Sequence, residues 1–193
     1  MFHYISEVYN ELNQTMNKNI EHYYTSINGP YTAVSLHKYA VEKYNNGKFV
    51  FVNSYNAKSV AYTGVEILNK NKNIKIDIID KGDDFFEYAA IHKNIQKIYR
   101  CINDVYCFSS VEASHNYDNN SLDFVFLEKI EDDADAFDQC SAWWPKIKSG
   151  GILSGDDYTD SSMPGYVRGV NKYFIDICPD NITHSPNWFI VKK

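Results

Sequence analysis

Three carboxylates stand at the ends of two apolar segments in the second half of the sequence. Glu128 follows the alternating apolar run 122–127, and Asp156 and Asp157 follow a second apolar run. The amphipathic stretch 132–148 separates the two runs. A strand, a helix and a second strand in this order form a parallel crossover unit, so the carboxylates are expected at one edge of a sheet. Converging carboxylate oxygens there are candidate ligands for a divalent cation.

The elements that position these residues alternate along the whole chain. Short apolar runs predict strands at 49–52, 74–79, 105–108, 122–127, from 152 onward, and at 188–191. Helical spacing of apolar residues covers 57–69, 85–98, 132–148 and 166–177, and Gly150-Gly151 is predicted to end the third of these helices. The alternation predicts an α/β fold, a doubly wound and mostly parallel sheet with helices on both faces.

We expect residues 1–193 to form a single domain. Residues 1–46 show helical spacing, interrupted at 28–30, and are predicted to be an N-terminal helical cover on a core formed by 47–193. This tyrosine-rich cover could equally form a homodimer contact.

The amino-acid composition limits the kinds of binding partner and the cellular compartment that are expected for this protein. The formal charge is −6, from 19 basic and 25 acidic residues, and the basic residues are scattered, which argues against a nucleic-acid partner. No apolar stretch approaches the roughly 20 residues that span a bilayer, and the N-terminus lacks the apolar segment of a signal peptide, so no membrane association is expected. The four cysteines have no metal-ligand spacing and indicate reduced thiols in a cytoplasmic protein.

With the strands placed, the chain resembles the class I S-adenosylmethionine-dependent methyltransferases. The resemblance lies in SLDFVFLE, AWWPKIKSGGILSGDDY, PGYVRGVNKYF and the terminal NWFIVKK, in that order. It is most specific for a small group with a Gly-Gly-x-x-x-Gly-(His/Asp)-Asp-Tyr tract, and it covers most of residues 47–193. It implies a Rossmann-like methyltransferase fold with S-adenosylmethionine as cofactor.

The cofactor half of the resemblance is divergent. Family members usually carry an acid and two glycines in the first strand-to-helix turn, where the backbone approaches the methionine moiety. Phe51 stands at the acid position, and Asn53 and Ala57 stand at the glycine positions. Asparagine tolerates a left-handed backbone, whereas Ala57 would be strained there. The residues of this turn that agree with the family pattern are Ser54, Tyr55, Lys58 and Ser59.

Three further positions correspond to cofactor contacts in the family. Asp80, at the end of the second predicted strand, stands where an acid accepts hydrogen bonds from the ribose hydroxyls; a turn or cap residue is the alternative. Ser109 stands where an acid near the adenine is common, and Ser110 follows it. A serine can still bond the adenine amine, but more weakly.

The resemblance also implies a role for the carboxylates. In metal-dependent O-methyltransferases, residues at the positions of Glu128, Asp156 and Asp157 hold an Mg²⁺-like ion that lowers the pKa of the acceptor hydroxyl. Asp156 and Asp157 are accordingly the candidate catalytic residues. A capped turn is the alternative interpretation of this pair.

Two functional hypotheses follow. The first is a methyltransferase that methylates an oxygen of a small molecule or sugar, with or without a divalent cation. The second is a non-catalytic protein of the same fold that binds a ligand or a protein partner. The replacements that favour the second hypothesis are Phe51, Asn53, Ala57 and Ser109.

Overall fold

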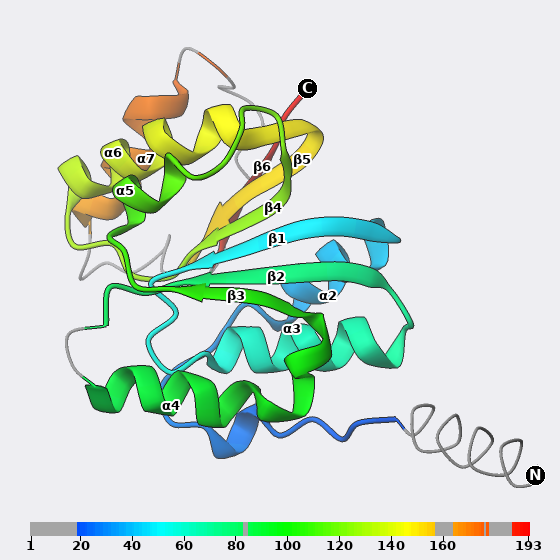
Figure 1. The fold of residues 1–193 in the computed structure, drawn as a ribbon. Coiled ribbons are helices and arrows are strands. Elements are labelled where there is room, and N and C mark those ends of the chain that lie inside the picture. Colours follow the sequence, from blue (N-terminus) through cyan, green and yellow to red (C-terminus); the bar gives the residue numbers. More distant parts are fainter. Residues whose placement is uncertain (1–18, 83–84, 157–163, 176, 178–186) are drawn as a thin grey trace, which may run out of the picture.

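The computed structural model describes residues 19–82, 85–156, 164–175, 177 and 187–193. In this part of the chain one sheet has the strand order β3-β2-β1-β4-β5-β6, and β6 alone runs antiparallel to its neighbour (Figure 1). The strands are β1 (Asn46–Val52), β2 (Asn73–Ile79), β3 (Ile102–Tyr106), β4 (Leu122–Leu127), β5 (Ile147–Gly155) and β6 (Trp188–Val191).

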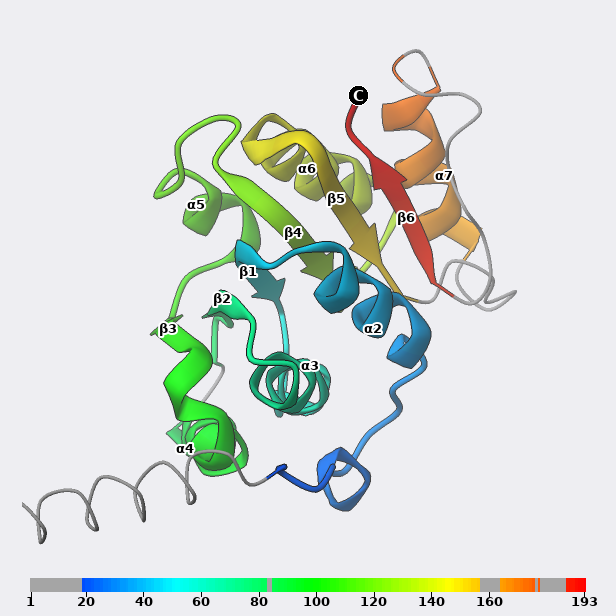
Figure 2. The same ribbon diagram turned by 90° about the vertical axis from the view of Figure 1, so that its right-hand side faces the viewer.

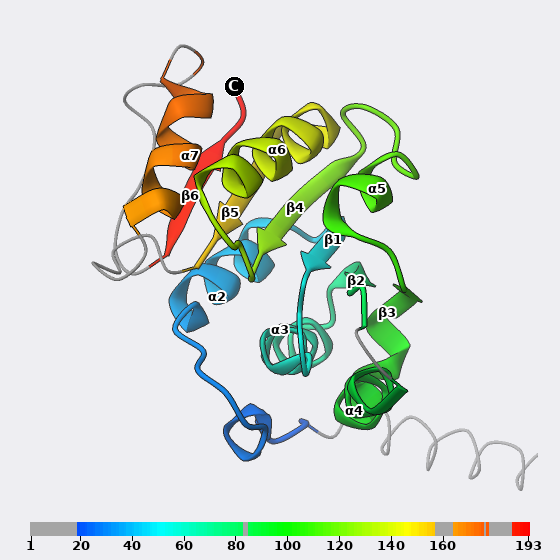
Figure 3. The same cartoon turned by 90° about the vertical axis from the view of Figure 1, so that its left-hand side faces the viewer.

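Helices cover both faces of the sheet (Figure 2). One face carries the 3-10 helices η1 (Tyr24–Ser26) and η2 (Gln96–Cys101) with α2 (Val34–Lys43), α3 (Lys58–Asn69) and α4 (Phe85–Ile95). The other carries α5 (Ser110–Ser114), α6 (Asp133–Trp143), the 3-10 helix η3 (Trp144–Lys146) and α7 (Pro164–Phe174), as Figure 3 also shows. The prediction of a doubly wound, mostly parallel α/β sheet is confirmed.

The apolar strands divide their side chains between two cores, as the two-residue period of a strand requires. Val50 of β1 packs in the cluster under α5, α6 and α7, and Phe51 packs in the cluster under α2 and α3. Every residue of β4 is buried, which explains its near-continuous apolar run. Trp143 is fully buried, and its indole N–H donates to Ser110 Oγ at 3.0 Å.

Two predicted boundaries are wrong. Within the described part of 1–46, only η1 and α2 are helical; the Gly29-Pro30 pair separates them, since proline cannot continue a helix. Gly150-Gly151 do not end a helix but lie inside β5, where Gly150 has φ +78°. The helix ends earlier, where Pro145 enters η3.

Candidate functional site

The turn between β1 and α3 has an unusual backbone. Asn53, Tyr55 and Ala57 have φ of +57°, +51° and +58°, so three alternate residues with Cβ atoms are left-handed. Each such residue costs roughly 1–2 kcal/mol relative to a right-handed one, less for asparagine. The predicted strain at Ala57 is therefore present. Glycine is the usual residue where the backbone is left-handed, yet none of these three positions is glycine.

Hydrogen bonds tie this turn to the two neighbouring strands. Asn53 N–H donates to Ile79 O at 2.7 Å, and Asn53 Nδ2 donates to Lys129 O at 2.8 Å. Tyr55 N–H donates to Asp80 Oδ2 at 2.7 Å. The strained backbone is thus held from the ends of β2 and β4, where the surrounding structure can over-determine it.

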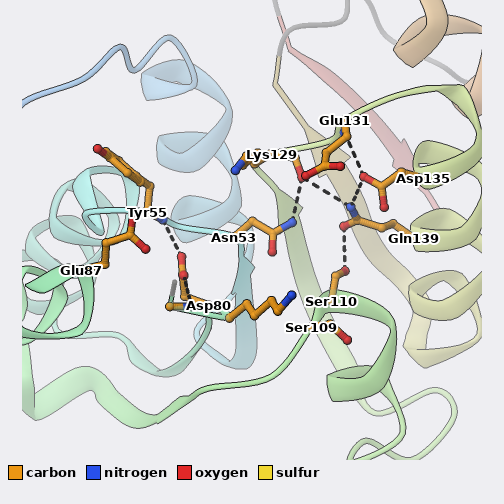
Figure 4. Close-up of a pocket in the computed structure, with 12 residues that line it drawn as sticks. Asn53, Tyr55, Asp80, Glu87, Ser109, Ser110, Lys129, Glu131, Asp135 and Gln139 are labelled. Carbon is orange, nitrogen blue, oxygen red and sulfur yellow. Dashed lines mark hydrogen bonds between the residues drawn. The ribbon is translucent and has the colours of Figure 1, made fainter. Parts of the chain in front are cut away.

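Asp80 has both of the roles considered for it. Its Oδ1 accepts from Gly82 N–H at 2.9 Å while its Oδ2 holds Tyr55, so the carboxylate fixes two turns. It also lines a cleft of about 330 Å³ beside these turns (Figure 4). A carboxylate has about four lone-pair sites and can accept several hydrogen bonds at once.

This cleft lies at the carboxyl edge of the sheet, where ligands of open α/β folds bind. The residues that line it are Asn53, Tyr55, Asp80, Lys81, Gly82, Glu87, Ser109, Ser110, Lys129, Glu131, Asp135 and Gln139. Four acids and two lysines among them give the lining a negative balance. Figure 4 shows the lining side chains coming from the turn after β1, from the ends of β2 and β4, and from α4, α5 and α6.

Five of the predicted cofactor-binding residues line the cleft, namely Asn53, Tyr55, Asp80, Ser109 and Ser110. The other three lie behind the turn. Ser54 and Ser59 are buried, and Lys58 Nζ donates to Gly29 O at 2.5 Å. Ser110 is also committed to the core, since its hydroxyl donates to Gln139 Oε1 at 2.7 Å and accepts from Trp143. Ser109 is freer, with a 3.3 Å bond to Glu112.

Sequence reasoning missed part of the lining on α6. Asp132 caps this helix, accepting from Ala134 N–H at 3.0 Å and Asp135 N–H at 2.9 Å. Asp135 and Gln139, one turn apart, face the cleft and bond each other at 2.9 Å. Their spacing of four residues was the available signal.

Glu128 lies beneath the turn rather than in the cleft lining. It accepts a hydrogen bond from Ser59 in the first turn of α3, and its backbone N–H donates to Val52 O at 3.0 Å. Burial raises the pKa of Glu128 to about 7; the Ser59 and Ser54 hydroxyls oppose this shift and the nearby Asp80 charge adds to it. A carboxyl group therefore lies under the turn between β1 and α3. It belongs to Glu128, directly after β4, and not to position 51, where the family usually has its acid.

The predicted metal site stays a prediction, because one of its three residues is not described. Asp156 N–H donates to Leu127 O at 3.4 Å, so the chain ends of β4 and β5 are adjacent as predicted. Asp157 lies outside the described residues. Among those described, no group of three His, Cys, Asp or Glu side chains could hold a metal ion. The Glu128 carboxyl accepts a hydrogen bond from Ser59 and lies outside the cleft lining.

Comparisons with known proteins agree with this architecture. No family model matches the sequence, and no curated protein matches it. A candidate caffeoyl-CoA O-methyltransferase from Staphylococcus aureus has a similar structure, with a TM-score of 0.63 and 12% identity over 96% of this chain and 91% of that one. The O-methyltransferase NovP gives 0.61 and 13% over 83% and 79%.

A candidate methyltransferase from Streptococcus mutans, solved in complex with SAH, gives a TM-score of 0.60 and 8% identity over 84% of this chain and 97% of that one. Similarity at these identities establishes the fold: the chain has the class I methyltransferase fold. In the part of the chain that the structure describes, no helix is long and apolar enough to cross a membrane.

Proposed function

We propose that this protein is an S-adenosylmethionine-dependent methyltransferase that methylates an oxygen of a small molecule or sugar. The observation that carries the proposal is the left-handed turn at Asn53, Tyr55 and Ala57, hydrogen-bonded to Asp80 beside a polar cleft. Backbone strain of this kind clusters at ligand-binding sites. A chain that only needed to connect β1 to α3 could do so without three left-handed residues.

The chemistry of the cleft suits the proposed cofactor. S-adenosylmethionine carries a sulfonium and an ammonium group, and the lining has an excess of acids. The Asp80 carboxylate could accept hydrogen bonds from ribose hydroxyls while it holds Tyr55. A volume of about 330 Å³ lies within the range of small-molecule sites.

The buried Phe51 does not obstruct this arrangement. Its ring packs in the core against His37 and Phe126, with centroid separations of 5.2 and 6.0 Å, and it is not part of the cleft lining. Phe51 therefore replaces a carboxylate without filling the cleft. The carboxyl of Glu128, which reaches the same turn from β4, is the group that we propose takes over its support.

Catalysis would consist mainly of positioning. The sulfonium is already an activated leaving group, so an acceptor oxygen held in line with the methyl group needs no covalent nucleophile. The acceptor would lie near the ends of β4 and β5, where Asp156 and the undescribed Asp157 remain the proposed catalytic residues. Because Ser59 engages Glu128, positioning rather than a cation would carry catalysis. We also predict that the acceptor is not a nucleic acid and that the protein is cytoplasmic. Two further predictions are that it belongs to the Gly-Gly…Gly-Asp-Asp-Tyr group and that it forms a homodimer.

The alternative is a non-catalytic binding protein of the same fold. Ser110 favours it, because this hydroxyl is used by Gln139 and Trp143 rather than offered to a ligand. Both functions predict that the cleft binds the cofactor, but only the methyltransferase would convert it to S-adenosylhomocysteine.

Calorimetry would test the binding step. S-adenosylmethionine and S-adenosylhomocysteine should bind at micromolar concentration, with and without Mg²⁺, whereas ATP and NAD should not, since the acidic lining repels phosphates. Absence of binding by both sulfur nucleosides would contradict the proposal.

A second assay distinguishes the methyltransferase from the non-catalytic binding protein. Release of S-adenosylhomocysteine would be followed by chromatography with a panel of catechols, phenols and sugars as acceptors. Turnover above the protein-free rate supports the transferase. Binding without turnover on any acceptor, in either buffer, would favour the non-catalytic alternative.

A further inference from the structure

A second and larger cleft, of about 550 Å³, lies on the face of the sheet that carries α5, α6 and α7. It occupies the amino-terminal halves of β1 and β2, away from the carboxyl edge. α5, on the same face, has only five residues. The loop after α5 forms one wall, through Tyr117.

The floor of this cleft breaks the apolar pattern of the strands. Val50 and Val125 pack in the core on this face, whereas the positions two residues before them, Lys48 and Asp123, are charged. In β2, Asp77 lies two residues before the buried Ile79. Asp77 and Asp123 are only 7% and 9% exposed, and a buried carboxylate costs stability unless something compensates it.

Both carboxylates are held in fixed orientations. Asp77 accepts from Asn103 Nδ2 at 2.7 Å and from Tyr117 OH at 3.0 Å, and burial raises its pKa. Asp123 Oδ2 accepts from the backbone N–H of Lys48 at 2.8 Å and from Lys148 Nζ at 3.0 Å. Orientation by several donors is what a binding site requires of its polar groups.

The cleft offers donors as well as acceptors. The exposed Lys48 side chain lies close enough to Asp77 to lower its pKa, opposing the effect of burial, and Lys148 pairs with Asp123. Lys75 also lines the cleft, so an anionic ligand would meet two carboxylates and a cationic ligand would meet three ammonium groups. A hydroxyl group both donates and accepts, so it can satisfy each kind of group in turn. The Tyr117 ring adds an apolar surface beside them.

We propose that this cleft binds an uncharged polyhydroxylated molecule of hexose size, with Asp77 accepting from ligand hydroxyls and Lys48 donating to them. The proposal does not depend on the methyltransferase function, because it concerns a different part of the sheet. Occupancy should leave the affinity for S-adenosylhomocysteine unchanged.

The test is a ¹H–¹⁵N titration of the full chain with D-glucose, D-galactose and N-acetyl-D-glucosamine, with inorganic phosphate as the charged comparison. At least one sugar should shift the amide signals of Gly47, Lys48 and Asp123 at millimolar concentration. Lys48→Ala, an exposed change that should leave the fold intact, should weaken binding about tenfold, because a bond to a charged group is lost. Asp77→Asn should weaken it similarly. Lys38→Ala, an exposed change on α2 on the opposite face, should bind as the unaltered protein does.

Three outcomes would overturn the proposal. The first is the absence of localised shifts with all three sugars. The second is phosphate shifting these signals when the sugars do not, which would indicate an anion site. The third is sugar binding that is equally strong in Lys48→Ala and Asp77→Asn, provided both variants melt cooperatively.

Discussion

The backbone N–H of Tyr55 donates to the Asp80 carboxylate at 2.7 Å, which joins the turn after β1 to the end of β2. The same carboxylate accepts from Gly82 and faces the proposed cofactor cleft. One acidic side chain thereby sets the shape of two cleft walls. Changes at Asp80 should consequently affect both ligand binding and the geometry of the turn.

Asp80→Asn should weaken S-adenosylhomocysteine binding by about tenfold or more, because hydrogen bonds to a charged acceptor are replaced by weaker neutral ones. Calorimetry on both proteins measures the difference. Asp118→Asn, a change in an exposed loop, is the matched control and should bind like the unaltered chain. An unchanged affinity in a folded Asp80→Asn protein would show that this carboxylate does not contact the ligand.

Tyr55→Gly should raise the free energy of unfolding by about 0.5 kcal/mol or more. The Tyr55 side chain is 62% exposed, so little packing is lost, and glycine relieves the left-handed penalty of roughly 1–2 kcal/mol against a smaller entropic cost. Tyr55→Ala keeps the unfavourable backbone and should give no such gain. Urea denaturation of the two variants compares them directly, and equal stabilities would argue that the turn is not strained at this position.

Much of the fold could be predicted because its strands are buried on both faces. The apolar runs that begin at Phe49 and Leu122 are typical of strands in a sheet covered by helices on both faces. The alternation of strands and helices along the chain then predicts the doubly wound arrangement. Residues 19–33 do not form the predicted helical cover beyond η1; instead the His22 and Tyr24 rings pack individually against Tyr62 of α3.

The site was less predictable for a different reason. Asn53 and Asp80 follow strands directly, so their place at the sheet edge is fixed by topology. Asp135 and Gln139 reach the cleft only through the rotation of α6 about its axis, which packing decides. The direction of the Glu128 side chain, toward Ser59, likewise depends on contacts between distant segments.

Glu128 should make stability depend on pH in a particular direction. Its pKa is about 7 in the folded protein and 4.5 in its unperturbed state, so the folded chain binds the extra proton between these values. The free energy of unfolding should therefore fall as pH rises from 5 to 8, by about 2 kcal/mol from this group. Glu128→Gln keeps an acceptor for Ser59 and removes the titration. The decline should appear in the difference between the unaltered and Glu128→Gln proteins at the two pH values, because subtracting the variant removes the opposite contribution of His37. An equal difference at pH 5 and pH 8 would contradict the assigned burial.

His37 should act in the opposite direction at lower pH. It is fully buried, and burial lowers its pKa from 6.5 to about 3, while its Nδ1 bonds Tyr31 OH at 2.7 Å and Thr63 Oγ1 at 3.1 Å. Below pH 6.5 His37 is protonated in the unfolded chain but stays neutral in the folded protein. The contribution of His37 to the free energy of unfolding is therefore lost as pH falls toward 3.

Between pH 7 and pH 5 the loss attributable to His37 should be about 2 kcal/mol. His37→Gln retains an acceptor for Tyr31 and has no charge to gain, so its stability should lack this acid-sensitive component, although it starts lower because the ring contacts with Phe51 and Phe126 are reduced. Comparing each protein with itself across pH removes that offset. His115→Gln, an exposed histidine change, should retain the acid sensitivity of the unaltered chain. If His37→Gln loses as much stability on acidification as the unaltered protein does, another group must be responsible, and His37 must already be protonated or accessible in the folded state.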